Sequence, residues 1–174
     1  MAKTSRPTLP NPEHANFPHA GFARRMGAIL YDLLVIAAVL MLAAGAALGA
    51  VAGMAALGVV SLGDGADHAS VLEGSWLYRL YLVGVIFWFY GGFWKRGGQT
   101  LGMRAWRLKV QNSDGSCISW SQALIRFASA LFGLSNIGVL FSRDNMAWHD
   151  QLAKCEVVVL SPEANKLRNW KKFA

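Results

Sequence analysis

The stretch MGAILYDLLVIAAVLMLAAGAALGAVAGMAALGVVSL, residues 26–62, decides the fold class of this chain. Its thirty-seven residues include one charged side chain, Asp32, and no proline. A helix needs about 20 apolar residues to cross a lipid bilayer, so the stretch is too long for one span and barely long enough for two. We predict one membrane-spanning helix over about 25–48 with a helical extension after it. The alternative is a tight helical hairpin.

A second apolar stretch, Trp76–Phe93, has aromatic residues at both ends, as spanning segments do at the two lipid–water interfaces. Lys95 and Arg96 end it. The loop between the two stretches, residues 63–75, carries acidic residues and no Lys or Arg, whereas the segments flanking the spans on the other side are basic. Positive charge stays on the cytoplasmic side of bacterial membranes. We therefore expect an inner-membrane protein with this loop outside and both chain ends in the cytoplasm.

The composition separates this chain from soluble domains and from nucleic-acid-binding proteins. It is 54% hydrophobic and 16% charged, against roughly 25% charged residues in an average soluble domain. The net charge of +7 would attract nucleic acid, but the basic residues flank apolar runs and form no nucleic-acid-binding motif. The expected partner of these residues is the lipid bilayer.

Residues 105–119 have the sequence pattern of a β-hairpin. Apolar and polar side chains alternate over 105–111, a turn signal occupies 112–116, and the alternation resumes at Cys117. A lone hairpin is marginally stable in water, so we predict that the Val-rich segment 155–160 pairs with it. The expected sheet is a small cytoplasmic hairpin or a three-stranded sheet.

The apolar segment 121–142 is long enough to cross the membrane once. A single crossing would place the basic C-terminal residues outside and would separate residues 155–160 from the hairpin. The segment has a natural break at Gly133-Leu-Ser-Asn-Ile-Gly138. We predict two short helices, about 119–132 and 139–153, that enter the membrane partway and return, which is tolerated where the broken backbone lies against protein or water. A single crossing is the alternative.

The predicted fold is therefore mainly α and integral to the membrane. It has two transmembrane helices, two short re-entrant or interfacial helices and the small cytoplasmic sheet. Three segments divide the chain: a flexible cytoplasmic tail over residues 1–20, a membrane domain over 21–160 and a basic tail over 161–174.

A few charged side chains fall inside or beside the apolar segments. Arg25 and Asp32 are seven residues apart on one helix face, and Asp32 lies about 10 Å further along the helix. A carboxylate at that depth costs a few kcal/mol unless it is paired or hydrated. Asp150, on the second short helix, returns near Arg25, so we predict an Arg25–Asp150 pair at the cytoplasmic mouth. Arg126, on the first short helix, is a further candidate partner for Asp32.

These residues belong to a pattern that resembles the RDD family of bacterial membrane proteins, named for one Arg and two Asp. The matching segments are Arg-Arg-Met-Gly-Ala-Ile-Leu-Tyr-Asp (24–32), Gly-Gly-Gln-Thr-Leu-Gly-Met-Arg (97–104) and Trp-His-Asp-Gln-Leu-Ala (148–153), closed by Val157-Val158-Val159. Met103 stands where the middle motif of such proteins more often has Lys. The resemblance implies that Asp32 and Asp150 are the two family aspartates. The family arginine is Arg25 or its neighbour Arg24.

The resemblance implies little chemistry, because the family has no settled general function; cation/proton exchange is proposed for some members. One hypothesis is transport, in which Asp32 takes up and releases a proton or cation in a wet pocket and Arg25 tunes its affinity. The alternative is structural: Arg25, Asp32, Asp150 and Arg126 form a buried docking network in a non-catalytic partner or assembly factor of another membrane protein.

We expect no enzymatic activity and no cofactor. The four histidines lack metal-ligand spacing, and no Gly-rich phosphate loop precedes a helix. Gly45, Gly49 and Gly53 lie four residues apart and place small residues on one helix face. This face either packs against the second span within the monomer or forms an interface with another copy or another membrane protein.

Overall fold

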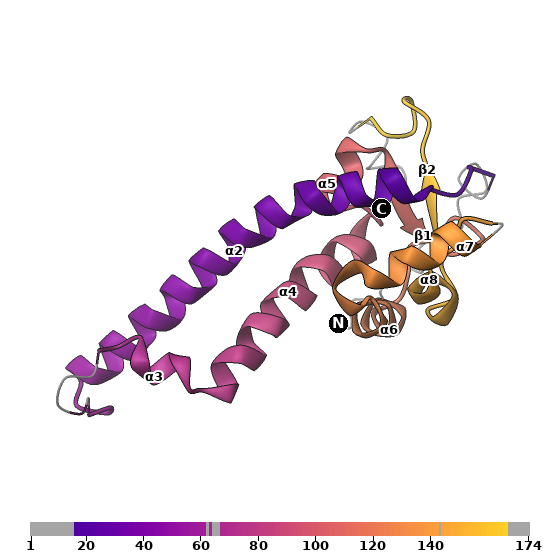
Figure 1. Ribbon diagram of the computed structural model, residues 1–174. Helices are drawn as coiled ribbons and strands as arrows, with labels where there is room; N and C mark the ends of the chain where they lie inside the picture. The colour runs from indigo at the N-terminus through magenta and orange to yellow at the C-terminus, as the bar shows by residue number, and fades with distance from the viewer. Residues whose placement is uncertain (1–15, 62, 64–66, 143, 167–174) are drawn as a thin grey trace, which may run out of the picture. The chain divides into compact units, whose positions relative to one another are not determined.

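The structure is a computed structural model that describes residues 16–61, 63, 67–142 and 144–166 (Figure 1). The chain divides into two compact units. The first consists of Met1–Leu33 and Phe89–Ala174, and the second of Leu34–Trp88. Helices predominate, and the small sheet belongs to the first unit.

Helix α2, Phe22–Ala56, is one continuous helix of 35 residues, and it covers most of the long apolar stretch (Figure 1). Among the described residues it is the one helix long and apolar enough to cross a membrane by itself. At about 1.5 Å per residue it is about 52 Å long, against about 30 Å for the hydrocarbon core of a bilayer. The predicted single helix is confirmed, and the alternative of a hairpin within this stretch is wrong.

The second predicted span is helical as well. It lies within α4, Trp76–Arg96, which follows the short helix α3, Ser70–Glu73. By length and composition α4 does not qualify as a span in the way α2 does. In the second unit its exposed face nevertheless carries large apolar side chains, namely Trp76, Leu77, Leu80, Val83 and Trp88. The Tyr81 hydroxyl donates to the Ala43 carbonyl of α2 at 3.3 Å.

The small-residue face of α2 is open within the second unit. A Cβ atom built at Gly45, Gly49 or Gly53 would meet no neighbouring heavy atom within 4 Å. The described part of the chain therefore packs nothing closely against these glycines.

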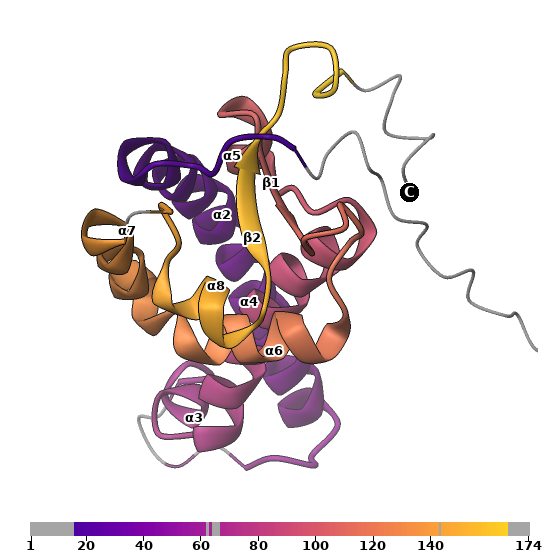
Figure 2. The same cartoon turned by 90° about the vertical axis from the view of Figure 1, so that its right-hand side faces the viewer.

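Strands β1, Leu108–Gln111, and β2, Glu156–Val159, form an antiparallel two-stranded sheet (Figure 2). Leu108 lies opposite Val159 at one end of the register. The predicted pairing of the Val-rich C-terminal segment with residues 105–111 is confirmed.

The second strand predicted for the hairpin, at Cys117, is wrong. Ser119 is instead the N-cap of α6, Trp120–Ser129. The Ser119 hydroxyl accepts from the Gln122 amide at 3.2 Å, and the Gln122 side-chain oxygen accepts from the Ser119 amide at 2.9 Å. This capping box satisfies two amides at the helix start. The capping box outweighs the short alternation of apolar and polar residues at Cys117, which has no neighbouring strand among the described residues.

The free edge of β2 is covered by the segment that precedes α2. His19 forms a bridge with Val158. The Ala20 amide donates to the Val157 carbonyl at 2.8 Å, and the Val159 amide donates to the Pro18 carbonyl at 2.9 Å. Strand β2 is thus hydrogen-bonded on both sides, and the sheet fixes the start of α2.

Four short helices build the segment between the two strands: α6, the 3₁₀ helix η1 at Leu131–Ile137, α7 at Gly138–Phe141 and α8 at Trp148–Leu152. The axis turns by 86° between α6 and residues 134–141. The bend comes earlier than the predicted break at 133–138, because α6 ends at Ser129 and most of that range lies in η1. A single helix over 139–153 is wrong, because an irregular segment that includes Asn145, with φ of +53°, separates α7 from α8.

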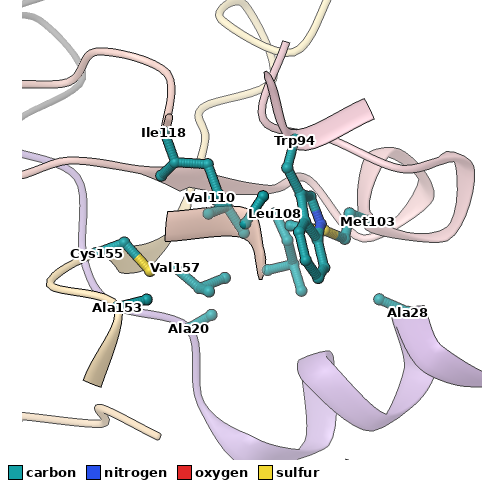
Figure 3. Close-up of a cluster of buried hydrophobic side chains, with 11 residues drawn as sticks. Ala20, Ala28, Trp94, Met103, Leu108, Val110, Ile118, Ala153, Cys155 and Val157 are labelled. Carbon is teal, nitrogen blue, oxygen red and sulfur yellow. The ribbon is translucent and has the colours of Figure 1, made fainter. Parts of the chain in front are cut away.

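The hydrophobic core of the first unit lies around the two strands (Figure 3). Leu108, Val110 and Val157 project from the sheet into a cluster with Trp94 of α4. The remaining labelled members are mostly small: Ala20, Ala28, Met103, Ile118, Ala153 and Cys155. Small side chains let α2 pack closely against this cluster, so that polar side chains of α2 contact polar groups of the other elements.

Candidate functional site

Asp150 is the centre of a buried ion cluster. Its side chain is 0% exposed, and it contacts two arginines. Arg25 Nη1 donates to one carboxylate oxygen at 2.6 Å, and Arg126 Nη1 donates to the other. The three residues come from α2, α6 and α8. Together they form a triad that ties three separate helices to one another.

Arg25 reaches further parts of the first unit. Its Nε donates to the Ala20 carbonyl at 2.9 Å, and its Nη2 donates to the Asn145 carbonyl at 3.1 Å. Its Nη1 also lies 3.5 Å from the Asn136 side-chain oxygen on η1. The side chain is 4% exposed. A guanidinium has five N–H donors in a fixed plane, and Arg25 uses them to join the strand segment before α2, η1 and the segment before α8.

Arg126 is 6% exposed, although it lies in a helix with apolar residues on its outer face. Its guanidinium carbon lies 5.1 Å from the centroid of the Trp94 ring, a cation–π arrangement. The Cys155 sulfur lies 3.5 Å from Nη1. The second arginine of the triad is therefore positioned by α4 and by Cys155, the residue before β2.

The electrostatics of the triad keep Asp150 ionised. Burial by itself would raise the pKa of Asp150, but the charges of Arg126 and Arg25 outweigh it and hold that pKa well below its usual range. Asp150 also accepts from the Ala147 amide at the start of α8, at 3.3 Å. A carboxylate held in this way does not exchange a proton near neutral pH, so Asp150 is suited to docking helices.

His149, next to Asp150, is buried and neutral. Its Nε2 lies 3.3 Å from Asp150 Oδ1, and its amide donates to the Ser135 hydroxyl at 2.9 Å. Burial and the positive charge of Arg126 lower the pKa of His149 to about 3, against the opposing effect of Asp150. The imidazole is therefore a neutral neighbour of the triad.

His149 predicts a pH dependence of stability. An unfolded histidine titrates near about 6.5, and the pKa of folded His149 is about 3, so unfolding takes up a proton between these values. The stabilisation is complete above about pH 6.5 and is lost as the pH falls toward 3. We expect a loss of up to about 2 kcal/mol between pH 8 and pH 5, measured by thermal unfolding in mild detergent. The loss should be smaller in His149→Gln, whereas His68→Gln should keep the wild-type profile. Identical profiles in all three proteins would contradict this assignment.

Asp32 has a different environment from Asp150. It is 2% exposed, and its partners are neutral. The Thr100 hydroxyl donates to Oδ2 at 2.5 Å, and the Gly102 amide donates to Oδ1 at 2.8 Å. The sequence suggests Arg25 or Arg126 as partners of Asp32, but both arginines bind Asp150 instead. The two aspartates are thus held in separate ways.

The turn that binds Asp32 is formed by the middle motif. Thr100 is the N-cap of α5, Leu101–Ala105, and its hydroxyl oxygen accepts from the Met103 amide at 3.1 Å. This contact directs the hydroxyl proton toward Asp32. A Cβ atom at Gly102 would collide with the Ala28 carbonyl and lie 2.9 Å from the Asp32 carboxyl carbon. Only glycine allows the Gly102 amide to come this close.

The sequence analysis does not predict this turn as the partner of Asp32, since residues 97–104 enter it only through the family resemblance. The available signal is the N-cap pattern, a Thr followed by a short helix that contains glycine. It also missed Asn136 as a neighbour of Arg25 and Trp94 as a neighbour of Arg126. Nothing in the local sequence places those two residues near the triad.

The sequence leaves open whether Arg24 or Arg25 is the family arginine, and the structure distinguishes the two. Arg25 is buried in the triad, whereas Arg24 is exposed and lines a pocket at the start of α2. Arg24 is not part of the network around Asp150. The geometry therefore favours Arg25 as the arginine that acts with Asp150.

The helices that bury the charged triad expose apolar side chains at the surface of the first unit. On α6, Arg126 is buried while Leu124 is 55% exposed. The same arrangement continues on η1, α7 and α8, whose exposed side chains include Leu134, Leu140, Phe141, Trp148 and Leu152. A water-soluble protein buries such residues and exposes its charges. This inverted pattern is typical of helices that face lipid.

The comparisons with known proteins agree with the motif segments. The sequence model of the RDD family matches residues 19–154 of the chain. This range includes both aspartates and all three arginines discussed above. No curated protein and no solved structure matches the chain.

Proposed function

Since this chain belongs to the RDD family, we propose that it is a multi-pass protein of the bacterial inner membrane in which Asp32 binds and releases a proton or a cation. Family membership and the apolar helix α2 indicate a membrane protein. In the proposed topology α2 and α4 cross the bilayer, and residues 120–141 enter it and return. Both chain ends are in the cytoplasm.

The membrane placement is supported by the distribution of charge and apolar surface. The triad residues are buried, and large apolar side chains of α6, α7 and α8 are exposed. Exposed apolar side chains also lie along α4. In lipid these faces are solvated favourably, and the buried charges remain paired.

One observation carries the transport proposal: Asp32 is a buried carboxylate with neutral hydrogen-bond donors, and no arginine of the described residues forms an ion pair with it. Burial opposes its negative charge, while the two hydrogen bonds favour that charge. The opposing effects bring the charged and neutral forms of Asp32 closer in free energy. A proton or a monovalent cation that reaches Asp32 would neutralise it.

The Thr100 hydroxyl can serve both forms of Asp32. It donates to the carboxylate at 2.5 Å while its oxygen accepts from Met103. A hydroxyl oxygen has two acceptor lone pairs, so after protonation it can rotate and accept from the Asp32 carboxyl group. The Gly102 amide keeps its bond to the other oxygen. Proton uptake at Asp32 would thus reverse this hydrogen bond, and the Thr100 O–H proton would give up the Asp32 oxygen as its acceptor.

The test is cation-dependent proton movement by the purified protein in liposomes with a trapped pH dye. An imposed Na⁺ or K⁺ gradient should change the internal pH when wild-type protein is present. Asp32→Asn should abolish the change while the protein still inserts and unfolds at a similar temperature. The control Asp114→Asn removes an exposed carboxylate and should keep the wild-type rate.

Two results would overturn the transport proposal. One is wild-type flux by Asp32→Asn. The other is the absence of flux by the wild-type protein under gradients of Na⁺, K⁺ and protons.

The second candidate function is that of a structural or assembly partner, and the open face at Gly45, Gly49 and Gly53 favours it. Small residues at this spacing allow two helices to approach closely in lipid. The expected result is an oligomer of the wild-type protein in nanodiscs, measured by chemical cross-linking, that Gly49→Leu disrupts. A wild-type monomer whose state Gly49→Leu leaves unchanged would remove the support for a self-association face.

A further inference from the structure

A basic pocket lies at the start of α2, and none of its lining residues belongs to the triad. Its volume is about 540 Å³. Three segments line it: residues 17–21 before α2, the end of β2 with Leu160 and Ser161, and the turn at Arg107 between α5 and β1. Arg24, in the first turn of α2, completes the lining.

The pocket holds two positive charges without a counter-charge. In the described part of the chain no carboxylate contacts the guanidinium of Arg24 or Arg107. The lining includes a third basic side chain, His19, which is engaged by the Glu156 carboxylate at 3.1 Å and by the Asp144 carbonyl at 2.6 Å. By contrast, Arg25 and Arg126 share the buried Asp150. The pocket thus offers an external anion two arginines that no described carboxylate pairs.

Arg107 is fixed in place before any ligand arrives. Its backbone has φ of +57°, a region that L residues seldom adopt. Two backbone hydrogen bonds hold it there: its amide donates to the Arg104 carbonyl at 3.1 Å, and its carbonyl accepts from the Leu160 amide at 2.7 Å. The second bond continues the ladder between the two strands. The side chain of Arg107 therefore starts from a rigid position at the rim of the sheet.

The other lining residues suit an amphiphilic ligand. Phe17, Val159 and Leu160 provide apolar wall, and the two arginines provide donors in the fork geometry that matches a phosphate group. In the proposed topology, on which this step rests, α2 begins at the cytoplasmic face, so the pocket lies at the level of the lipid headgroups. Anionic lipids attract basic residues at this surface.

We propose that this pocket binds the headgroup phosphate of an anionic phospholipid, with Arg24 and Arg107 as the ligand-binding side chains. The phosphate oxygens accept from both guanidinium groups. The glycerol and the first carbons of the acyl chains lie against Phe17 and Val159. A bound lipid would join the start of α2 to the rim of the sheet, since Arg24 and Arg107 come from these two elements.

The test measures binding of dioctanoyl phosphatidylglycerol to the full chain in neutral detergent by native mass spectrometry. Dioctanoyl phosphatidylcholine and inorganic phosphate are the comparison ligands. We expect the wild-type protein to bind the phosphatidylglycerol about tenfold more tightly than the phosphatidylcholine, because the two lipids share the phosphate but the choline ammonium is repelled by the two arginines. The double variant Arg24→Gln/Arg107→Asn should lose this preference; Asn tolerates the positive φ at position 107.

The matched control is Arg96→Gln, which removes an exposed arginine at the end of α4 and should keep the wild-type preference. Equal losses in the double variant and in Arg96→Gln would mean that general surface charge attracts the lipid, and the pocket assignment would be wrong. If inorganic phosphate binds as tightly as the phosphatidylglycerol, the ligand of the pocket is a soluble phosphate and the lipid assignment is wrong. Binding is measured without an ion gradient, so its outcome is separate from that of the Asp32 flux experiment.

Discussion

Asp150→Ala is expected to destabilise the protein by about 3–5 kcal/mol, because it leaves two buried arginines without their shared counter-charge. Arg25 and Arg126 cannot reach bulk water without opening the contacts between α2, α6 and α8. The measurement is the free energy of unfolding in mild detergent, from denaturant or thermal melts. The variant should also become more sensitive to proteolysis near α8.

The matched control is Asp144→Ala, which removes an exposed carboxylate close in sequence to the triad. Its cost should stay below about 1 kcal/mol, as for most surface charges. A triple variant, Arg25→Met/Asp150→Leu/Arg126→Met, should recover part of the stability, since a buried ion cluster can be replaced by apolar residues of similar volume. If Asp150→Ala and Asp144→Ala cost the same, the triad is not what docks these helices.

Gly102→Ala is expected to be the second most damaging substitution. The new methyl group would collide with the Ala28 carbonyl, which belongs to the backbone of α2 and cannot rotate away. Overpacking of this kind costs about 1–3 kcal/mol. The collision also pushes α5 away from Asp32, so the hydrogen bonds from Thr100 and Gly102 should lengthen. We expect lower thermal stability together with loss of any flux that depends on Asp32.

Gly45→Ala provides the control for this substitution. It makes the same change in the middle of α2, where a Cβ atom would meet no neighbour within 4 Å. Alanine is favoured over glycine in a helix by about 1 kcal/mol, so this variant should be as stable as the wild type or more stable. A Gly102→Ala protein with wild-type stability would show that α5 does not pack against α2 as described.

The parts of the fold that the sequence predicts well are those with a strong and uninterrupted signal. The apolar stretch at 26–62 predicts helix throughout, with a hairpin as the alternative to one long helix, and the Val-rich segment at 155–160 needs a strand partner. The errors lie in short elements. At Ser119 a helix cap competes with a strand pattern of a few residues, and the positive φ of Asn145 falls where a single helix was predicted. Such choices depend on local hydrogen bonds that periodicity does not register.

The contacts of the candidate site likewise include one that the sequence predicts and others that it does not. The contact between Arg25 and Asp150 follows from opposite charges and from the predicted return of the chain after residue 133. The partners of Asp32 do not, because they are a backbone amide and a hydroxyl that only the turn at Thr100 brings to it. Charge patterns in a sequence indicate ionic partners, but they do not indicate neutral hydrogen-bond donors. This is why Arg126 was predicted for the wrong aspartate.

The distance in sequence between the members of the triad has a consequence for biosynthesis. Arg25 and Asp150 are 125 residues apart, and ribosomes add about 5–20 residues per second. Arg25 therefore waits about 6–25 s after its own synthesis before its counter-charge exists. A nascent chain halted before α8 would hold Arg25 and Arg126 with nothing to neutralise them. Synthesis of α8 is thus the step before which the triad cannot form.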